Sequence, residues 1–377
     1  MAIPYSTPGV HFEQVSREPR ASLSTGVPVF LGSTLSSELT AGGPVMALNR
    51  AGWTQLDASR GTKWAEGYLP FAVRGFFENG GARCYVVGAG SPDPGDALAL
   101  IDALDDFDLV CAPELALSSG STLIDGQMKI IEFCEARSVF AVLDSIGAPS
   151  LTQSTGVNVT GVGAHHEDLS SALEHADPAW GGSAALYAPW VKVQGAGYLP
   201  GPHAAGAAAG FVPPCGHVAG MYASADQRTG VFMPPANQAL EGVLDLELYF
   251  DDDTQVTLDP MPSATAPRRR INCLRAFPGR GTRIWGAGTL SRDSTWTHIN
   301  VRRLALTIER WFALQMRGLA FEPNNSTLRV RITAEVSAFL ERLYDLGAFK
   351  GKSPERRFTS SATPRTTLHR RGTRGCS

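Results

Sequence analysis

The chain has 377 residues, which is long enough for two or three domains with cores of their own. Only 18% of the residues are charged and the formal net charge is −3, so there is no electrostatic reason to expect a nucleic acid or an anionic membrane as partner. No apolar run approaches the roughly 20 residues that cross a bilayer, and the start has no signal-peptide pattern, so we expect a protein made and kept in the cytoplasm.

Residues 1–20 predict an extended N-terminal arm. Pro4, Pro8 and Pro19 flank the stretch "GVHFEQV". Proline lacks a backbone N–H, which confines any strand here to the edge of a sheet. We therefore expect the arm to make few contacts with the rest of its own chain.

Residues 21–200 predict an α/β domain. A buried strand, "STGVPVFLGST", is followed by an amphipathic helix in "WAEGYLPFAVRGFFENGG", which Gly80 and Gly81 end. Strands and helices then alternate, and repeated βαβ units predict a mostly parallel sheet with helices on its faces. The expected strands are 82–90, 107–114, 139–145 and 184–193, and the expected helices are 96–104, 126–138 and 166–176.

Residues 201–352 predict a second, mixed α/β domain after the Gly- and Pro-rich break at 195–214. We expect a short helix at 215–226, strands at 240–250, 254–260, 270–277 and 282–288, and two long helices. The three aspartates at 251–253 are interpreted as a solvated turn between strands. Each long helix has an apolar stripe that predicts domain core. The stripes are Val301, Leu304, Ile308 and Trp311, and Val336, Phe339, Leu340 and Leu343.

Residues 353–377 predict a disordered basic tail. From Glu355 onward the chain has six arginines, one glutamate and few apolar residues. Such a segment buries too little apolar surface to offset its loss of conformational entropy.

Three stretches resemble sites of catalysis or binding but do not fit. In "CYVVGAGSPDPG", Asp93 stands where a GxGxxG loop needs its third glycine. In "GAFKGKS" the glycines are too close for a P-loop, and the stretch follows a helix. His165 and His166 are adjacent on a helix and point about 100° apart, so they cannot share a metal, and the nearby Glu167 and Asp168 are interpreted as acids at a helix start. We predict no catalytic, cofactor or metal residues.

The six cysteines form no CxxC pair. Cys84, Cys111 and Cys134 lie in or beside apolar runs, where cysteine is usually a small buried hydrophobe. A disulfide or a metal cluster is the less favoured alternative.

The stretch "FPGRGTRIWGAGTL", residues 277–290, leaves two interpretations open. Its glycines either cradle a phosphate or let strands turn and pack closely.

Several motifs, taken together and in order, resemble one family. "YSTPGVHFEQV", "STGVPVFLGST" and "YLPFAVRGFFENGGARCYVV" are similar to the beginning of contractile tail sheath proteins of bacteriophages and related contractile injection systems. The resemblance runs from about residue 5 to 354. The later motifs are "ALYAPWVKV", "VPPCGHVAGMYASADQRTGVFMPPAN", "INCLRAFPGRGTRIWGAGTL", "NVRRLALTIERW", "FEPNN" and "FLERLYDLGAFKG".

The resemblance implies α/β domains assembled as stacked, hexameric rings around an inner tube, with baseplate and terminator proteins as further partners. The assembly contracts and drives the tube through a target envelope, without catalysis. It also implies that extended terminal arms add strands to the sheets of neighbouring subunits. The arm residues are Tyr5, Pro8, Gly9, Val10, Phe12 and Val15. It favours turns and close packing, and not phosphate binding, at Gly279, Gly281, Gly286 and Gly288.

The resemblance further places the domain formed by the chain ends innermost. The helix from about Thr333 to Leu346 would then face the tube, although a solvated face fits its charges equally well. Its polar residues are Glu335, Glu341, Arg342 and Asp345.

The chain departs from the family pattern after Pro354. Family members continue with an alternating apolar segment that ends in the C-terminal arm, whereas this chain has the arginine-rich tail. The abrupt change suggests a frameshift, and a genuine variant arm is the alternative. Two other functions stay open: an α/β hydrolase or nucleotide-binding enzyme, and a baseplate or terminator protein that shares the sheath domain.

Overall fold

A computed structural model describes most of the chain between residues 23 and 349. The predicted arm at 1–20 and the tail at 353–377 lie outside the described residues. For residues 56–60 only the backbone is described. The described ranges are 23–32, 44–60, 67–88, 93–118, 120–147, 159–195, 210–259, 269–317, 319 and 321–349.

The described chain is built on an eight-stranded sheet in the order β11-β10-β6-β5-β4-β1-β3-β2. Its six inner strands run parallel, and an antiparallel strand, β2 or β11, lies at each edge. Inner strands such as "PVFLG" and "FAVLD" are almost wholly apolar because both of their faces are buried. The predicted, mostly parallel sheet is confirmed. The strands are β1 (Pro28–Gly32), β2 (Val45–Asn49), β3 (Arg83–Gly88), β4 (Leu109–Cys111), β5 (Phe140–Asp144), β6 (Ala184–Ala188), β10 (Ile271–Phe277) and β11 (Gly281–Ile284).

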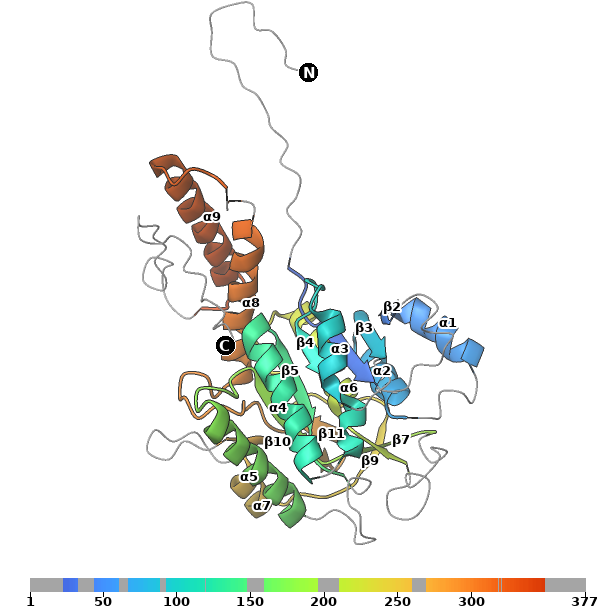
Figure 1. The fold of residues 1–377 in the computed structure, drawn as a ribbon. Coiled ribbons are helices and arrows are strands. Elements are labelled where there is room, and N and C mark those ends of the chain that lie inside the picture. The colour runs from blue at the N-terminus through green and yellow to red at the C-terminus, as the bar shows by residue number, and fades with distance from the viewer. Residues whose placement is uncertain are drawn as a thin grey trace, which may run out of the picture.

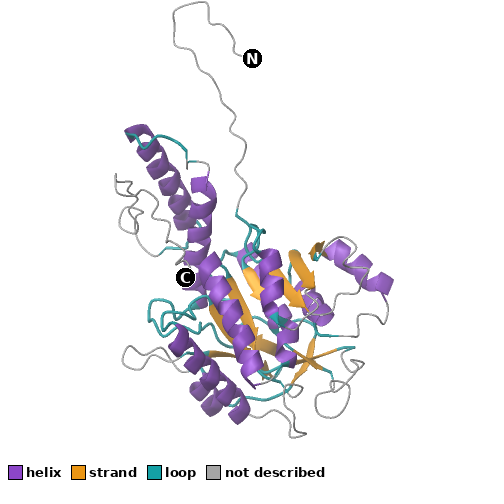
Figure 2. Ribbon diagram, viewed as in Figure 1, coloured by secondary structure: helices purple, strands orange, loops and turns teal. Residues whose placement is uncertain are grey.

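Helices cover both faces of the sheet. One core cluster joins β1 and β3 side chains such as Phe30 and Val86 to α2 (Leu69–Glu78) and α6 (Cys215–Arg228). The alternate side chains, such as Val29 and Val87, pack with the helices of the other face. Figures 1 and 2 show α3 and α4 in front of the sheet. The helices of this face are α3 (Pro94–Ile101), α4 (Gly120–Arg137), α5 (Val159–Ala176) and α7 (Asp252–Leu258).

The remaining described elements lie beside these layers. Helix α1 (Arg50–Arg60) follows β2, and the 3₁₀ helix η3 (Pro113–Leu117) follows β4. Figure 1 shows α8 (Ile299–Arg317) and α9 (Ser326–Asp345) extending from one end of the α/β body.

Helices α2 and α6 approach each other backbone to backbone. A Cβ atom on Gly216 would lie 2.1 Å from the carbonyl oxygen of Ala72, and one on Gly220 would lie 2.5 Å from that of Phe76. On α2, a Cβ on Gly75 would lie 2.5 Å from the ring of His217. These positions accept only glycine, so the sequence of both helices fixes how closely they pack.

The predicted strand 184–193 is in fact two strands that belong to different sheets. It divides at Pro189, after which β7 (Val191–Val193) joins β8 (Phe211–Val212) and β9 (Val243–Leu246) in a three-stranded sheet. Trp190, at the division, is fully buried, and its Nε1 donates a hydrogen bond to the Ser145 carbonyl at 2.9 Å. The mostly apolar run suggested a single strand, although Pro189 marked the point of division.

The predicted strand 254–260 is wrong, because this segment forms α7. Asp251 caps the helix: its side chain accepts a hydrogen bond from the Thr254 amide at 2.8 Å. Asp252 and Asp253 lie in the first turn, where carboxylates stabilise the positive end of the helix dipole. The three aspartates therefore begin a helix, and the interpretation as a turn between strands is corrected. The Thr and Val residues of the segment suggested a strand, but the hydrogen bond from the Thr254 amide to the Asp251 side chain stabilises the start of a helix instead.

Helix α5 begins at Val159, about two turns before its predicted start at residue 166. Glu167 and Asp168 are therefore exposed residues in the middle of the helix, and their interpretation as acids at its N-terminus is wrong. Their exposure to solvent is sufficient to explain why two acidic residues occur at these positions.

The apolar stripe predicted as core on the first long helix is not its buried face. Val301 is exposed, and Leu304, Ile308 and Trp311 are only half-buried. The side of α8 turned toward the body instead carries Ile299, Arg303, Leu306, Thr307 and Arg310. The prediction failed because α8 packs against polar side chains at the amino ends of the parallel strands.

The stripe on the second long helix is partly buried. Val336 and Leu343 are buried, whereas Phe339 and Leu340 are half-buried. The Phe339 ring stacks on Trp311 of α8, with 4.0 Å between centroids and 2° between planes. Contacts between the two helices therefore cover part of both stripes.

Other predictions are confirmed or set in context. Cys84, Cys111 and Cys134 are buried free thiols, as expected. Strands β10 and β11 belong to the same sheet as β1 to β6, so the sheet contains strands from both sides of the predicted domain boundary at residue 200. None of the helices in the described part of the chain is long and apolar enough to span a membrane.

Candidate functional site

The glycine-rich segment 277–290 begins with a tight hairpin turn between β10 and β11. Gly279 and Gly281 have φ angles of +70° and +72°, which glycine adopts without strain. The Arg280 amide donates to the Phe277 carbonyl at 2.9 Å and closes the turn. These two glycines therefore serve the backbone conformation.

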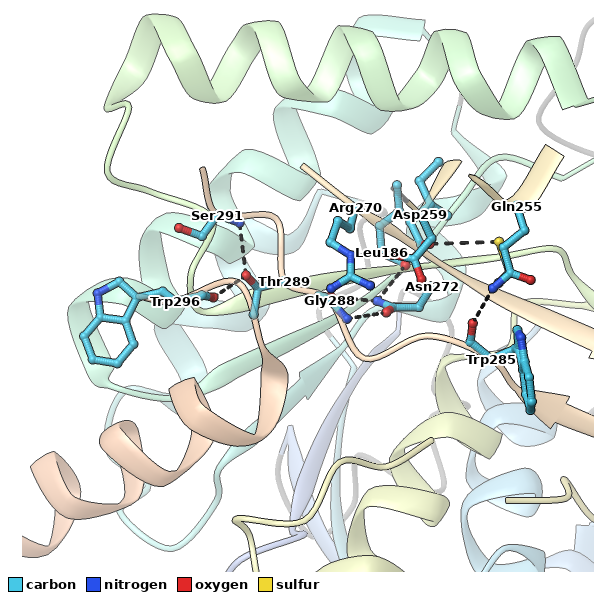
Figure 3. Close-up of polar contacts among 12 residues, drawn as sticks. Leu186, Gln255, Asp259, Arg270, Asn272, Trp285, Gly288, Thr289, Ser291 and Trp296 are labelled. Carbon is cyan, nitrogen blue, oxygen red and sulfur yellow. Dashed lines mark hydrogen bonds and ion pairs between the residues drawn. The ribbon is translucent and has the colours of Figure 1, made fainter. Parts of the chain in front are cut away.

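The next two glycines let the chain pass close over β10. A Cβ on Gly286 would lie 2.9 Å from Asn272 Oδ1, and one on Gly288 would lie 2.8 Å from Arg270 Cβ. Asn272 holds the passing chain: its Oδ1 accepts from the Gly288 amide at 2.7 Å, and its Nδ2 donates to the Gly288 carbonyl at 2.8 Å (Figure 3). The buried amide side chain thus takes the place of a neighbouring strand.

Further polar contacts occupy the surroundings of this segment. Gln255 of α7 donates to the Trp285 carbonyl at 2.9 Å, and Arg270 forms an ion pair with Asp259 (Figure 3). The Thr289 hydroxyl donates to the Trp296 carbonyl at 2.5 Å. Atoms of Asn272 and Arg270 thus fill the space beside Gly286 and Gly288. The predicted turn, at Gly279 and Gly281, and the predicted close packing, at Gly286 and Gly288, are confirmed.

The segment after β3, whose sequence superficially resembles a dinucleotide loop, is followed by the capped helix α3. The Asp93 carboxylate accepts a hydrogen bond from the Gly95 amide at 2.9 Å and pairs with Lys129 at 2.6 Å. A carboxylate of the chain therefore already lies at the positive end of α3, where a bound phosphate would need to lie. This geometry is that of an ordinary N-cap.

Buried titratable groups at the carboxyl side of the sheet take part in structural hydrogen bonds. Asp144 Oδ1 accepts from the Cys215 amide at 2.8 Å, and burial raises the pKa of Asp144 to about 7. His165 Nε2 is 2.9 Å from Gln127 Oε1, and Gln127 Nε2 donates to the Asp144 carbonyl at 2.9 Å. Burial lowers the pKa of His165 to about 4. Within the described ranges, no three His, Cys, Asp or Glu side chains are grouped to hold a metal ion.

A network of charged side chains lies at the opposite end of the strands, where the amino ends of the parallel strands meet. Asp108 directly precedes β4, Ser138 lies just before β5, and Ser183 directly precedes β6. All three contact α8, so α8 crosses the amino ends of the parallel strands. Strand β1 also begins at this end of the sheet, where the Val27 amide donates a hydrogen bond to Asp108 Oδ1 at 2.7 Å.

Arg303 is the centre of this network. It is 2% exposed and donates two hydrogen bonds to Asp226 of α6, at 2.9 and 2.7 Å, and one to Asp108 at 2.9 Å. Its guanidinium lies 4.8 Å above the Tyr222 ring, and the Tyr222 hydroxyl is hydrogen-bonded to that of Tyr187 at 2.6 Å. Burial would lower the pKa of Arg303, but the carboxylates of Asp226 and Asp108 outweigh it and raise that pKa. The buried charges are therefore paired.

Neighbouring arginines extend the contact along α8. Arg302 donates to Glu135 of α4 and to the Ser183 hydroxyl, both at 3.0 Å. At the far end of the helix, Arg317 forms an exposed bidentate pair with Asp105 at 2.6 and 3.1 Å. Sequence reasoning missed these residues. Their signal was present, because Arg303, Arg310 and Arg317 recur every seven residues and so share one face of the helix.

The residues predicted to face the tube lie on α9. Glu341, Arg342 and Asp345 are exposed, and Glu335 accepts a hydrogen bond from Arg331 at 3.3 Å. The predicted arm residues Tyr5, Pro8, Gly9, Val10, Phe12 and Val15 lie outside the described residues.

Comparisons with known proteins agree on one family. The sequence profile described as "Phage tail sheath protein central domain" matches residues 90–290, which is more than half of the chain. A search of curated proteins finds no match.

Solved structures of contractile injection systems share the fold. A chain in the PVC sheath complex, an extracellular contractile injection system in its contracted state, is 25% identical with a TM-score of 0.67, and the alignment covers 99% of both chains. A chain of the anti-feeding prophage helical sheath in its contracted state is 26% identical with a TM-score of 0.61, covering 93% of this chain and 86% of that one. A chain of the anti-feeding prophage baseplate is 25% identical with a TM-score of 0.64, covering 93% and 87%. The chain belongs to the phage tail sheath protein family.

Proposed function

We propose that this protein is the structural subunit of a contractile tail sheath, which polymerises around an inner tube and contracts to drive the tube through a target envelope. The observation that carries the proposal is the fold match with a subunit of a contracted sheath over 99% of both chains. The energy of contraction comes from the cooperative repacking of interfaces between subunits, and the chain itself catalyses no reaction. The family profile over residues 90–290 supports this structural role.

The partners in this proposal are further copies of the chain in stacked hexameric rings, an inner tube protein, and baseplate and terminator proteins. Related chains form a helical sheath and a baseplate in the anti-feeding prophage, which supports self-assembly and contact with a baseplate. Assembly takes place in the cytoplasm, and the finished particle is a phage tail or a phage-tail-like particle.

Electron microscopy of the purified full-length chain tests the proposal directly. We expect helical tubes or stacked rings once the tail 353–377 is replaced by an alternating apolar arm, and few or none from the unaltered chain. A monodisperse monomer that hydrolyses esters or binds nucleotide would instead support the enzyme alternative. Rings of fixed height that never stack would favour a baseplate or terminator protein sharing the domain.

The N-terminal arm has a specific role in this proposal. Residues 5–15 would add a strand to the sheet of a neighbouring subunit, where main-chain hydrogen bonds supply the affinity. Pro4, Pro8 and Pro19 favour an extended segment with few contacts to its own subunit. Deleting residues 1–20 should therefore leave a folded protein, by circular dichroism, that forms no tubes. Unfolding of the truncated chain would show that the arm is part of the subunit core.

The tube contact is proposed on α9. Glu341 and Asp345 are exposed on this helix and could meet a complementary tube surface. Reversing both to lysine should reduce co-sedimentation with the tube protein while the melting temperature hardly changes. Reversing Glu167 and Asp168, which are exposed on α5, is the matched control. Equal effects of both pairs would place the contact elsewhere.

The C-terminal tail is expected to weaken assembly of the chain into a sheath. Residues 353–377 carry six arginines and Pro364, and lack the alternating apolar pattern of a pairing strand. We propose that the chain folds through Gly351 but assembles poorly as written. Replacing the tail with the alternating segment of another reading frame should restore long tubes. Contractile tubes from the unaltered chain would show that the basic tail is a genuine variant arm.

A further inference from the structure

A cavity of about 220 Å³ lies between α8, the end of α4 and the loop before β4. Apolar side chains, among them Phe107 and Leu314, form part of its lining. Its charged and polar lining residues are Asp105, Arg137, Ser138, Glu309, Arg310 and Arg317. The cavity therefore lies beside the amino ends of the parallel strands, where α8 crosses them.

Arg310 differs from the other arginines of α8 that contact the body. It is 7% exposed, and neither its Nη1 nor its Nη2 has a hydrogen-bond partner. Arg302, Arg303 and Arg317 each bond to a carboxylate. Leaving buried donors of a charged group unsatisfied is costly, so a folded protein retains such a group where something else completes it.

The carboxylates near Arg310 are already engaged. Asp108 bonds to Arg303 and to the Val27 amide. Asp106 pairs with Arg83 at 2.8 Å and accepts from the Tyr85 hydroxyl at 2.6 Å. Within the cavity, Asp105 is bonded to Arg317, and Glu309 accepts a hydrogen bond from the Ser138 hydroxyl at 2.8 Å. Completion of Arg310 by the described part of the same chain would require one of these bonds to break.

The lining selects the chemistry of what could enter. Three arginines face the cavity with two carboxylates, so it favours an anion. A guanidinium offers two parallel N–H donors that match the two oxygens of a carboxylate. The cavity has room for one such side chain but not for a folded element.

The charge of the chain indicates where the carboxylate comes from. The whole chain has a net charge of −3, and residues 353–377 contribute +5 through six arginines and one glutamate, which leaves −8 for residues 1–352. A second copy of the chain therefore presents an acidic body to an arginine-lined cavity.

We propose that the cavity receives an acidic side chain from a second copy of the chain, and that its carboxylate forms a bidentate pair with Arg310. The inference rests on the proposed function, because it needs copies to assemble. The pair completes Arg310 only in the assembled particle. It thereby joins α8 of one subunit to the body of its neighbour.

Cross-linking within assembled particles tests the pairing. Particles are formed from a mixture of ¹⁴N- and ¹⁵N-labelled Arg310→Lys chains and treated with a carbodiimide, which links an amine to a carboxylate that it touches. We expect position 310 to be linked to an acidic residue in peptides that combine the two labels. Arg292→Lys is the control, because Arg292 pairs with Glu174 of the same chain and should give single-label peptides only. Links from position 310 only to carboxylates of the same label, or no link at all, would overturn the proposal.

A second variant separates pairing from folding. Arg310→Met should raise or maintain the melting temperature of the unassembled chain, because it removes an unsatisfied buried cation, and should reduce the yield of tubes by tenfold or more. Arg317→Met, on the same helix and cavity, should assemble normally because Asp105 already satisfies Arg317. Normal tubes from Arg310→Met would refute the pairing while leaving the sheath proposal intact. All of these assemblies use the chain with the replaced tail; failure of that chain to form any particle while Arg310 is intact would refute both.

Discussion

Helices α6 and α8 both pack against the α/β body, but by opposite means. Helix α6 meets α2 through Gly216 and Gly220, with backbones in direct contact. Helix α8 meets the amino ends of the strands through Arg302 and Arg303, and leaves part of its apolar stripe exposed. One contact excludes every side chain larger than hydrogen, and the other consists of long side chains with fixed hydrogen-bond geometry.

The difference separates the permanent core from the surface available for assembly. Close-packed glycine contacts have no alternative arrangement, so α2 and α6 should move as one body. Ion pairs specify an orientation and can be remade with other partners. The half-buried stripe on α8, the exposed Phe321 before α9 and the exposed Val330 on α9 remain for contacts outside the subunit.

The largest expected effect is at the charged contact. Arg303→Met would leave Asp108 and Asp226 buried without a counter-charge, and should lower the free energy of unfolding in urea by about 3–5 kcal/mol. Arg317→Met, which breaks an exposed pair on the same helix, should cost less than about 1 kcal/mol. Similar losses from both variants would show that burial does not control the strength of the contact.

The next effect is at the glycine contact. Gly216→Ala would place a Cβ 2.1 Å from the Ala72 carbonyl oxygen, which forces the helices apart and should cost about 1–3 kcal/mol or more. The matched control is Gly163→Ala on α5, where nothing lies within 4 Å and the variant should gain up to about 1 kcal/mol of helix propensity. A stable Gly216→Ala protein would mean that the α2–α6 contact can adjust.

Asp144 provides a pH test of the core beside α6. Its pKa is raised in the folded state to about 7, so folding favours the protonated form, and its contribution is complete below the unfolded pKa of about 3.9 and is lost as the pH rises through 7. Between these values stability should fall by up to about 1.4 kcal/mol per pH unit from this group. Asp144→Asn keeps an acceptor for the Cys215 amide and should remove that slope.

The Asp144 result is taken as the difference between variant and unaltered chain across pH 4–8. Buried histidines act in the opposite direction: the pKa values of His165 and His217 are lowered to about 4, so their contribution is lost as the pH falls from about 6.5. Because both proteins contain these histidines, their effect cancels. A pH-independent difference would show that Asp144 titrates normally.

The smallest effect on the body is expected at the α8–α9 contact. Trp311→Ala removes the ring stack with Phe339, so amide exchange in α9 should become faster while global stability changes by less than about 1 kcal/mol. Val330→Ala, at an exposed position on α9, should leave exchange unchanged. If Trp311→Ala destabilises the whole chain, α9 belongs to the cooperative core.

Much of the fold was predictable because its signals are local. Apolar runs of five or six residues indicated β1, β3 and β5, and the alternation with helices indicated a parallel sheet. The family resemblance favoured a turn at Gly279 and Gly281, and their positive φ angles confirm it. Local signals were also overlooked: the Asp251 cap marks α7, and the seven-residue spacing of arginines marks the inner face of α8.

The sequence by itself determined the family, the layered α/β class and the packing role of the glycine-rich segment. The tertiary structure decided which face of α8 is buried, that the run 184–193 divides between two sheets, and that the buried Nη1 and Nη2 of Arg310 have no hydrogen-bond partner among the described residues. These outcomes depend on groups that are distant in sequence, such as Asp108, which lies 195 positions from Arg303. A helix with both an apolar face and an arginine-bearing face can bury either one. Here the carboxylates at the amino ends of the strands need cationic partners, so the arginine-bearing face is buried. The reason is that an unpaired buried charge costs more free energy than a half-exposed apolar stripe.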